Sequence, residues 1–335
     1  MHAIRLHAFG PPENLVHERV DDPVPAPGQV RIAVAAAGVH LVDTALRSGV
    51  PLGGHWKPTP LPTVPGREVA GTVDALGDGV DPAWLGRRVS AHLGMVPGGY
   101  AELAVTAVEK LHPLPDDLPE THAVALLGTG RMTMGILRFA AIQPGDTVLV
   151  LAAAGGIGAL LTQVARHRGA TVIGAAGGPA KVETVRGLGA DLAVDYDRAD
   201  WADTVRGAFG DRPVRYVFEG VGGERALAAI RLLAPGGAHL AYGTASQGIG
   251  DAESATLPKE ELAERGITSE VVLGPALFER IGGMENLGVL EEEALDLARE
   301  GVAVPLTQTF PLAEAAAAHR ALESRATVGK VVLVP

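Results

Sequence analysis

A buried strand that leads into a cluster of glycines and then into a helix is the feature that most constrains this fold. Residues 148–165 begin as an apolar strand, turn at Gly155, Gly156 and Gly158, and continue as a helix. Glycines let the backbone approach a pyrophosphate closely, and the free amides of a helix N-terminus bind its negative charge. The spacing is not a strict G-x-G-x-x-G. Because the turn lies between a strand and a helix, we interpret it as a dinucleotide site rather than a tight turn without a ligand.

Strands and helices alternate along the chain around this turn. The expected strands are residues 146–152, 170–175, 192–194, 216–219 and 238–242. The expected helices are residues 159–168, 181–188, 199–208 and 225–233. Such alternation requires right-handed crossovers and predicts a parallel sheet.

The two ends of the chain follow a different pattern. Short β-like runs separated by prolines and glycines occur at residues 30–35, 68–74 and 88–91. Towards the C-terminus, two amphipathic helices and a final strand are expected at residues 285–299, 312–322 and 330–335, and the acidic residues 291–293 are expected to form a solvated helix face.

These patterns together predict an α/β protein with two domains. A doubly wound parallel-sheet domain, residues 121–264, is expected to be inserted into a β-rich domain built from residues 1–120 and 265–335. The length of 335 residues fits two domains of ordinary size.

Charge and composition exclude several classes of function. The chain has 28 Lys and Arg against 39 Asp and Glu, so its net charge of −11 disfavours nucleic acids and anionic membranes. Cysteine is absent, which excludes disulfides, a thiolate nucleophile and Cys-ligated zinc. The N-terminus shows no signal peptide, and we expect a cytoplasmic protein. The motifs G-x-S-x-G, H-E-x-x-H and G-x-x-x-x-G-K-[ST] do not occur.

The strand after the glycine turn indicates which dinucleotide to expect. In NAD-binding sites, a carboxylate about 20 residues beyond the glycines holds the ribose 2′-hydroxyl. This strand ends at residues 172–178 without an acid, and Lys181 follows closely. A cation without a carboxylate suits a 2′-phosphate, so the sequence predicts NADPH. The alternative for Lys181 is a solvated lysine at a helix start.

Several further motifs occur in one order along nearly the whole chain. They are residues 37–44 (AGVHLVDT), 65–73 (PGREVAGTV), 98–102 (GGYAE), 189–191 (GAD), 234–237 (APGG) and 329–332 (GKVV). With the glycine turn, they resemble the zinc-free quinone oxidoreductase family of the medium-chain dehydrogenase/reductase superfamily.

This resemblance implies a GroES-like β domain, a Rossmann domain and a nicotinamide held in the cleft between them. It also implies that the following residues bind the cofactor: Gly155, Gly156, Ile157 and Gly158 at the pyrophosphate, Lys181 and Tyr196 near the adenosine 2′-phosphate, Val221 and Gly243 at the nicotinamide half, and Lys330 from the closing Gly-Lys motif. Family members often associate through their Rossmann sheets, so a homodimer is expected.

The zinc-dependent members of the superfamily differ at two positions. They have a Cys near position 40 and a His at the position of Arg67. Only His40, Asp43 and Glu68 are imaginable metal ligands here, and a guanidinium beside them disfavours a dication. We therefore predict no metal.

Three residues are candidates for catalysis. His40 is the best hydrogen-bond or proton donor, although a buried structural histidine is an equal alternative. Asp43 either orients His40 or a ribose hydroxyl, or caps the following helix. Arg131 either attracts an anionic substrate or the cofactor phosphate, or is a surface arginine at a helix start. Tyr100 is expected to be structural.

Three functions are compatible with this sequence. The first is an NADPH-dependent quinone oxidoreductase that transfers hydride without zinc. The second is an NADPH-dependent reductase of activated C=C bonds, such as those of enoyl or alkenal compounds. The third is an NADPH-binding sensor or structural protein with little turnover. Both reductases use a small-molecule electron acceptor, a quinone or a conjugated carbonyl compound.

Overall fold

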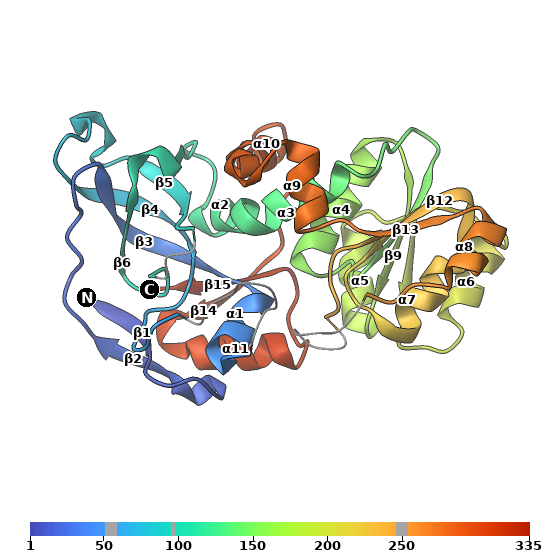
Figure 1. Ribbon diagram of the computed structural model, residues 1–335, viewed down its shortest axis with the longest axis horizontal. Coiled ribbons are helices and arrows are strands. Elements are labelled where there is room, and N and C mark those ends of the chain that lie inside the picture. Colours follow the sequence, from blue (N-terminus) through green and yellow to red (C-terminus); the bar gives the residue numbers. More distant parts are fainter. Residues whose placement is uncertain (51–58, 95–97, 246–253) are drawn as a thin grey trace. The chain divides into compact units, whose positions relative to one another are not determined.

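The computed structural model describes residues 1–50, 59–94, 98–245 and 254–335. The chain divides into two compact units (Figure 1). Unit 1 comprises Met1–Thr129 and Pro305–Pro335, and unit 2 comprises Gly130–Val304. In the described residues, no helix is long and apolar enough to span a membrane.

Unit 1 is built on two β-sheets. A hairpin of β1 (His2–Leu6) and β2 (Leu15–Arg19) forms a two-stranded antiparallel sheet. The larger sheet has the order β14-β15-β3-β4-β5-β7, and β6 pairs with β3. Its strands are β3 (Gln29–Val39), β4 (Glu68–Leu76), β5 (Arg88–His92), β6 (Leu103–Ala107), β7 (Leu111–Pro113), β14 (Thr307–Pro311) and β15 (Lys330–Val334). The C-terminal strand β15 therefore pairs with β3 from the N-terminal part of the chain.

Three α-helices complete the described part of unit 1: α1 (Leu41–Ser48), α2 (Glu120–Ala125) and α11 (Ala315–Glu323). Along β3, buried and partly exposed side chains alternate at first, as in a sheet with one covered face. The last four residues of β3 are all buried, because α2 also packs there. His40, the residue directly after β3, therefore lies in a well-packed part of the unit.

Unit 2 contains a six-stranded, fully parallel sheet in the order β10-β9-β8-β11-β12-β13. Its strands are β8 (Thr147–Leu151), β9 (Thr171–Ala176), β10 (Leu192–Asp195), β11 (Val214–Glu219), β12 (Leu233–Ala241) and β13 (Thr268–Val271). Counted along the chain, this is the 3-2-1-4-5-6 order of the Rossmann fold. The order reverses between β8 and β11, where such folds bind ligands beyond the carboxyl ends of the strands.

The helices of unit 2 precede, alternate with and follow its strands along the chain (Figure 1). They are α3 (Arg131–Leu137), α4 (Gly156–His167), α5 (Pro179–Gly187), α6 (Trp201–Phe209), α7 (Gly223–Ile230), α8 (Lys259–Arg265), α9 (Pro275–Ile281) and α10 (Leu287–Arg299). The end of this unit is fixed to α4, because the Gln163 carboxamide donates to the Val304 carbonyl and accepts from the Val304 amide, both at 3.0 Å.

The units differ in extent from the predicted domains, 121–264 against 1–120 and 265–335. Unit 2 continues to Val304 because α10 packs on α3. Two ion pairs join these helices: Arg131 with Glu291 at 2.7 Å, and Arg138 with Glu293. The expectation of a solvated acidic face at 291–293 is wrong for Glu291, which is buried against that arginine.

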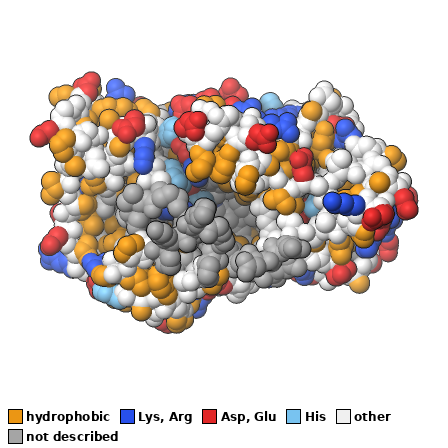
Figure 2. All heavy atoms as spheres, in the orientation of Figure 1, with side chains coloured by type: hydrophobic (Ala, Val, Ile, Leu, Met, Phe, Trp, Pro, Cys, Tyr) orange, Lys and Arg blue, Asp and Glu red, His pale blue; other side chains and the backbone are white. Residues whose placement is uncertain are grey.

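Two expected elements differ in detail. The helix expected at 225–233 ends at Ile230, because β12 already starts at Leu233 and pairs with Val214. The sheet also has a sixth strand, β13, that the alternation in sequence did not indicate. On the visible face of the molecule, Lys and Arg side chains are interspersed with Asp and Glu (Figure 2).

Candidate functional site

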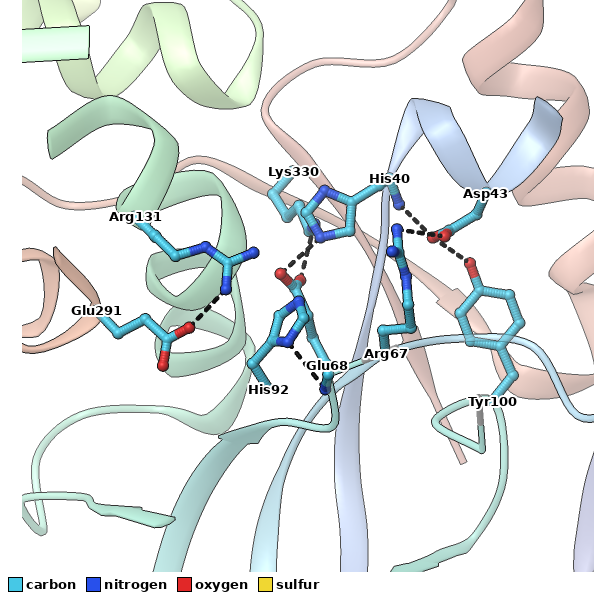
Figure 3. Close-up of polar contacts among 10 residues, drawn as sticks. His40, Asp43, Arg67, Glu68, His92, Tyr100, Arg131, Glu291 and Lys330 are labelled. Atoms are coloured by element: carbon cyan, nitrogen blue, oxygen red, sulfur yellow. Dashed lines mark hydrogen bonds and ion pairs between the residues drawn. The ribbon is translucent and has the colours of Figure 1, made fainter. Parts of the chain in front are cut away.

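His40 stands at the junction between β3 and α1 in unit 1 (Figure 3). It is the N-cap residue of α1, and Asp43 follows three positions later. The Asp43 carboxylate accepts a hydrogen bond from the backbone amide of His40 at 2.8 Å, which satisfies an amide that the helix leaves free. Asp43 therefore both caps the helix and fixes the backbone of His40. The helix begins at Leu41, so Asp43 lies within its first turn rather than before it.

The imidazole of His40 contacts an ion pair that the sequence did not indicate (Figure 3). Its Nε2 lies 2.6 Å from Oε1 of Glu68 and 2.9 Å from Nζ of Lys330. The Lys330 ammonium in turn lies 3.0 Å from Oε2 of Glu68. The side chains of Glu68 and Lys330 are 0% and 4% exposed, whereas that of His40 is 22% exposed. His40 is therefore the member of this cluster that reaches solvent.

The electrostatics of the cluster keep the carboxylate charged. Burial opposes ionisation of Glu68, but the charges of His40 and Lys330 outweigh it and lower the pKa of Glu68 well below its usual range. Burial lowers the pKa of Lys330, and Glu68 opposes that shift. Nε2 of His40 thus faces the Glu68 carboxylate, which can accept a hydrogen bond, and the Lys330 ammonium, which holds its own proton less tightly than an exposed lysine does. The imidazole can donate to Glu68 or accept from Lys330, so the cluster offers two positions for one proton.

Two glycines leave room for this cluster. A Cβ at Gly38 would collide with Oε2 of Glu68 and approach Lys330, and a Cβ at Gly128 would collide with Oε1 of Glu68 and approach the ring of His40. Neither position has a positive φ angle, so close approach rather than backbone conformation requires glycine here. These glycines, with an acid at the start of an apolar strand, are the sequence signals that could have revealed the cluster.

A second chain of buried polar groups begins at Asp43. The Tyr100 hydroxyl donates to Oδ2 of Asp43 at 3.0 Å, and Nε2 of His319 lies 3.3 Å from the same hydroxyl. Nδ1 of His319 lies 3.4 Å from the Arg47 guanidinium, which also pairs with Glu323 at 2.5 Å. All these contacts are satisfied when His319 is neutral and carries its proton on Nε2. Tyr100 therefore has the structural position that the sequence predicts.

Arg67 lies on the other side of Asp43. One of its terminal nitrogens is 3.5 Å from Oδ1 of Asp43, and its side chain is 16% exposed. It lines a pocket together with Asp43, Arg47, Leu46 and Phe9. Sequence reasoning considered this arginine only as a reason against a metal.

The glycine turn in unit 2 has the geometry of an anion-binding helix start. α4 begins at Gly156. The amide of Ala159 donates to the carbonyl oxygen of Gly155 at 2.8 Å, which closes the first turn of the helix. By helix geometry, the amides of Gly156, Ile157 and Gly158 have no acceptor within the helix. A Cβ at Gly158 would collide with the carbonyl oxygen of Ala152, so glycine lets the helix lie close to the end of β8.

Lys181 and Tyr196 lie beyond the carboxyl ends of β9 and β10. Lys181 is in the first turn of α5, and Tyr196 follows β10 directly. The Arg225 guanidinium lies over the Tyr196 ring, 5.1 Å from its centroid, and pairs with Asp197 at 2.5 Å. Arg225 is a cation of this corner that sequence reasoning missed, because it comes from α7, some 30 residues beyond Tyr196.

Val221 and Gly243 follow neighbouring strands, β11 and β12. Glu219, buried at the end of β11, accepts from the amides of Val221 and Gly222 and so fixes this turn. A Cβ on Gly243 would lie 3.3 Å from the carbonyl oxygen of Gly220, so the two turns are close together.

Two predicted site residues form ion pairs within their own units. Arg131 is at the start of α3 and pairs with Glu291 at 2.7 Å, so its charge is compensated inside unit 2. Lys330 is at the start of β15, where Glu68 and His40 hold its amine in unit 1. The structure thus gathers His40, Asp43 and Lys330 in unit 1, and gives Arg131 a structural ion pair.

Comparison with known proteins assigns the family. Residues 26–116 match the model of the alcohol dehydrogenase GroES-like domain, and residues 156–276 match that of the zinc-binding dehydrogenases. A 2-haloacrylate reductase from a Burkholderia species is 36% identical, with 98% of each chain covered. A quinone oxidoreductase from Pseudomonas aeruginosa is 33% identical, with 99% of each covered.

A solved structure agrees with these matches over its whole length. The Escherichia coli quinone oxidoreductase complexed with NADPH superimposes with a TM-score of 0.83 at 28% identity, and 100% of each chain is covered. The chain therefore belongs to the quinone oxidoreductase family of the medium-chain dehydrogenase/reductase superfamily, a family of oxidoreductases.

Proposed function

We propose that the protein is an NADPH-dependent quinone oxidoreductase that works without zinc. The observation that carries this proposal is the set of groups beyond the carboxyl ends of β8, β9 and β10 in unit 2. A helix start with free amides lies at the point where the strand order reverses, and Lys181 and Arg225 lie near the ends of β9 and β10. β9 itself ends in alanines rather than an acid. The nearby carboxylates are already bound, Asp195 by the Gly178 amide at 2.9 Å and Asp197 by Arg225. Relatives and structural neighbours named as quinone oxidoreductases support the activity.

The residues present fit NADPH. The amides of Gly156, Ile157 and Gly158 would hold the pyrophosphate, and Lys181 with Tyr196 would hold the 2′-phosphate. Val221 and Gly243 lie at the carboxyl ends of the central strands, where the nicotinamide half would lie. NADPH, when bound, supplies a hydride from C4 of its nicotinamide to the acceptor.

The residues present do not fit a zinc ion. In the described parts of the chain, no three His, Asp or Glu side chains are grouped to hold a metal. Nε2 of His40, the best available ligand atom, already faces Glu68 and the amine of Lys330. A catalytic zinc requires three protein ligands and an open position, and a neighbouring amine and the Arg67 guanidinium oppose a dication.

His40 is proposed to supply the proton that a reduced quinone oxygen needs. Nε2 of the imidazole is held between Lys330 and Glu68, so Nδ1 is the nitrogen left to donate to an acceptor. When Nδ1 gives up its proton, Nε2 takes one from Lys330 at 2.9 Å, whose pKa burial has lowered. Asp43 acts as a positioning residue because it holds the His40 backbone.

A second candidate function is reduction of a C=C bond conjugated to a carbonyl group. The specific observation is the full-length similarity, at 36% identity, to a 2-haloacrylate reductase. Conjugation spreads the developing charge towards an oxygen in both chemistries, so the same donors serve both.

NADPH oxidation followed by absorbance tests the proposal. A quinone and a simple conjugated enone are compared at equal concentration, with NADH as the control for the cofactor. Oxidation with the quinone supports the first function, and faster oxidation with the enone would favour the second. Preference for NADH would contradict the role given to Lys181. Tight NADPH binding without oxidation by either acceptor would indicate the sensor or structural protein instead.

The cytoplasmic location and the homodimer remain predictions of the same proposal. The dimer is supported by the free edge of β13 in the described sheet.

A further inference from the structure

The Arg67 guanidinium is a desolvated cation with few partners. Its Nε is fully buried and has no hydrogen-bond acceptor among the described residues. Its one ion pair there, with Oδ1 of Asp43, is at 3.5 Å, which is long for a charged hydrogen bond. A guanidinium has five N–H donors, and leaving them unsatisfied in a buried position costs free energy.

Asp43 does not fully satisfy this cation because its carboxylate has other donors. Oδ2 accepts from the Tyr100 hydroxyl at 3.0 Å and from the His40 amide at 2.8 Å. The neighbouring Arg47 is different, since it bonds to the Gly10 carbonyl at 3.0 Å and to Glu323 at 2.5 Å. Among the described residues of this region, Arg67 is therefore a basic group with donors to spare.

The guanidinium lines a pocket of mixed character. About 490 Å³ of empty space, part of it open to solvent, lies among these residues. Leu6, Phe9, Leu46 and Pro65 form apolar walls, and Thr59 and Thr63 add hydroxyl groups. Apolar walls around a cation with unused donors suit a small organic anion. A carboxylate matches the fork of a guanidinium because it can accept two parallel N–H bonds.

We propose a substrate class for the second candidate function: the protein reduces small α,β-unsaturated carboxylates, and Arg67 binds their carboxylate group. This inference rests on the proposed function in one respect, because it needs NADPH as the hydride donor. Asp43 contacts both the Arg67 guanidinium and the backbone amide of His40, which links the proposed carboxylate site to the proposed proton donor (Figure 3).

The reaction balances without a further reagent. Hydride from NADPH forms a C–H bond at the β-carbon, and the C=C π bond breaks. Its electron pair moves to the α-carbon and into the carboxylate oxygens, and a proton from His40 then joins the α-carbon. NADPH is oxidised to NADP⁺, and the unsaturated acid is reduced to the saturated acid. A carboxylate gains a second negative charge on the way, and a fixed guanidinium stabilises that charge more in the transition state than in the ground state.

The first experiment compares 2-chloroacrylate, its methyl ester and 1,4-benzoquinone as acceptors for the wild-type protein. The ester is intrinsically more electrophilic, so only recognition of charge makes the acid the better substrate. We expect kcat/KM for the acid to exceed that for the ester at least tenfold. A saturated acid such as 2-chloropropionate should inhibit competitively, and its methyl ester should not.

The second experiment uses Arg67→Met, Arg67→Lys and a matched control, Arg87→Met, at an exposed arginine of the same unit. Arg67→Met should lower kcat/KM for 2-chloroacrylate about a hundredfold. It should change the value for benzoquinone only a few-fold and leave the Kd for NADPH unchanged. Arg67→Lys should recover part of the loss because it restores the charge without the fork. Arg87→Met should match the wild type.

Each other outcome has a definite meaning. If the wild type reduces benzoquinone but uses the acid no better than the ester, the inference is overturned and the quinone reductase stands. If Arg67→Met lowers kcat/KM equally for the acid and for the quinone while circular dichroism shows an intact fold, Arg67 does not recognise the carboxylate. If NADPH is oxidised by none of the acceptors, the proposed function fails as well. If Arg67→Met does not fold, the wild-type comparison and Arg67→Lys decide.

Discussion

His40 is held at two points, its backbone amide by Asp43 and its ring Nε2 by Glu68 and Lys330. The His40 ring cannot turn away from a bound electron acceptor without losing its contact with the fully buried Glu68 carboxylate. The contact with Lys330 that positions the proposed proton donor would also supply its next proton. This explains why a lysine and a glutamate can be buried here at all, since each compensates the other.

Replacing His40 with asparagine tests this role. His40→Asn keeps a polar side chain that can still bond to Glu68 or Lys330, but it cannot transfer a proton. We expect kcat for the quinone to fall by about 10²-fold or more, with an unchanged Kd for NADPH. Stopped-flow and equilibrium binding measurements check the two quantities. The control is His17→Gln at an exposed position of the same unit. An unchanged kcat would show that His40 does not transfer a proton and serves only as the N-cap of α1.

His319 makes stability depend on pH. Burial lowers its pKa from 6.5 to about 4, and the neighbouring Arg47 contributes in the same direction. Above pH 6.5 the ring is neutral in both states, so it adds no pH dependence. Between pH 6.5 and 4 the unfolded chain binds a proton that the folded chain excludes, so stability falls as the pH falls.

Urea unfolding at pH 7 and pH 5 measures this effect. The free energy of unfolding of the wild type should fall by about 2 kcal/mol more than that of His319→Asn between these pH values. The variant should be less stable at pH 7, because it loses contacts to Tyr100 and Arg47. Equal pH dependence in both proteins would contradict a buried neutral histidine.

At the scale of elements, α4 depends on one glycine that has no room for a side chain. A Cβ at Gly158 would collide with the carbonyl oxygen of Ala152, so α4 would have to move away from the end of β8. Such a shift displaces the free amides of the helix start. Gly187, in the last turn of α5, offers a matched contrast, because nothing lies within 4 Å of a Cβ there.

We therefore expect opposite results for two glycine-to-alanine changes. Gly158→Ala should raise the Kd for NADPH at least tenfold and lower the melting temperature. Gly187→Ala should leave the Kd unchanged and be neutral or stabilising by up to about 1 kcal/mol, since alanine favours helix. Isothermal titration and thermal melting measure both. Equal affinity in the two variants would contradict the close packing of α4 on β8.

Elements with a clear period were predictable from sequence, and elements defined by partners were not. The strands and helices around the glycine turn follow from alternation alone. The strand β13 (Thr268–Val271) did not, because its side chains are mostly exposed and it is defined by pairing with β12. Likewise α10 was predicted as a helix, but its place beside α3 depends on the ion pair between Arg131 and Glu291, residues 160 positions apart.

The site shows the same limit. His40 and Asp43 are three residues apart, so their relation could be expected from the sequence. Glu68 and Lys330 meet because β3 pairs with both β4 and β15, which no local pattern reveals. Arg67 was visible in the sequence, but its unused donors are a property of the folded pocket.

For the whole molecule, the edge strand β13 predicts how two copies meet. β13 pairs with β12 on one side only within the described sheet, and Val271 is 55% exposed there. An open edge with an exposed apolar side chain is a template for pairing with another strand. We expect a homodimer in light scattering and a monomer for Val271→Lys, with Val304→Lys, an equally exposed valine of unit 2, as the control. Monomeric wild-type protein would contradict this prediction.

The packing of α3 against α10 also bears on protein engineering. The first and last helices of unit 2 lie together, and Gln163 fixes the last residue, Val304. A segment whose first and last helices pack together is a good candidate for excision, permutation or transplantation into a host loop. Residues 130–304 are thus a ready starting point for a genetically encoded reporter, in which a fluorescent protein senses a bound nucleotide.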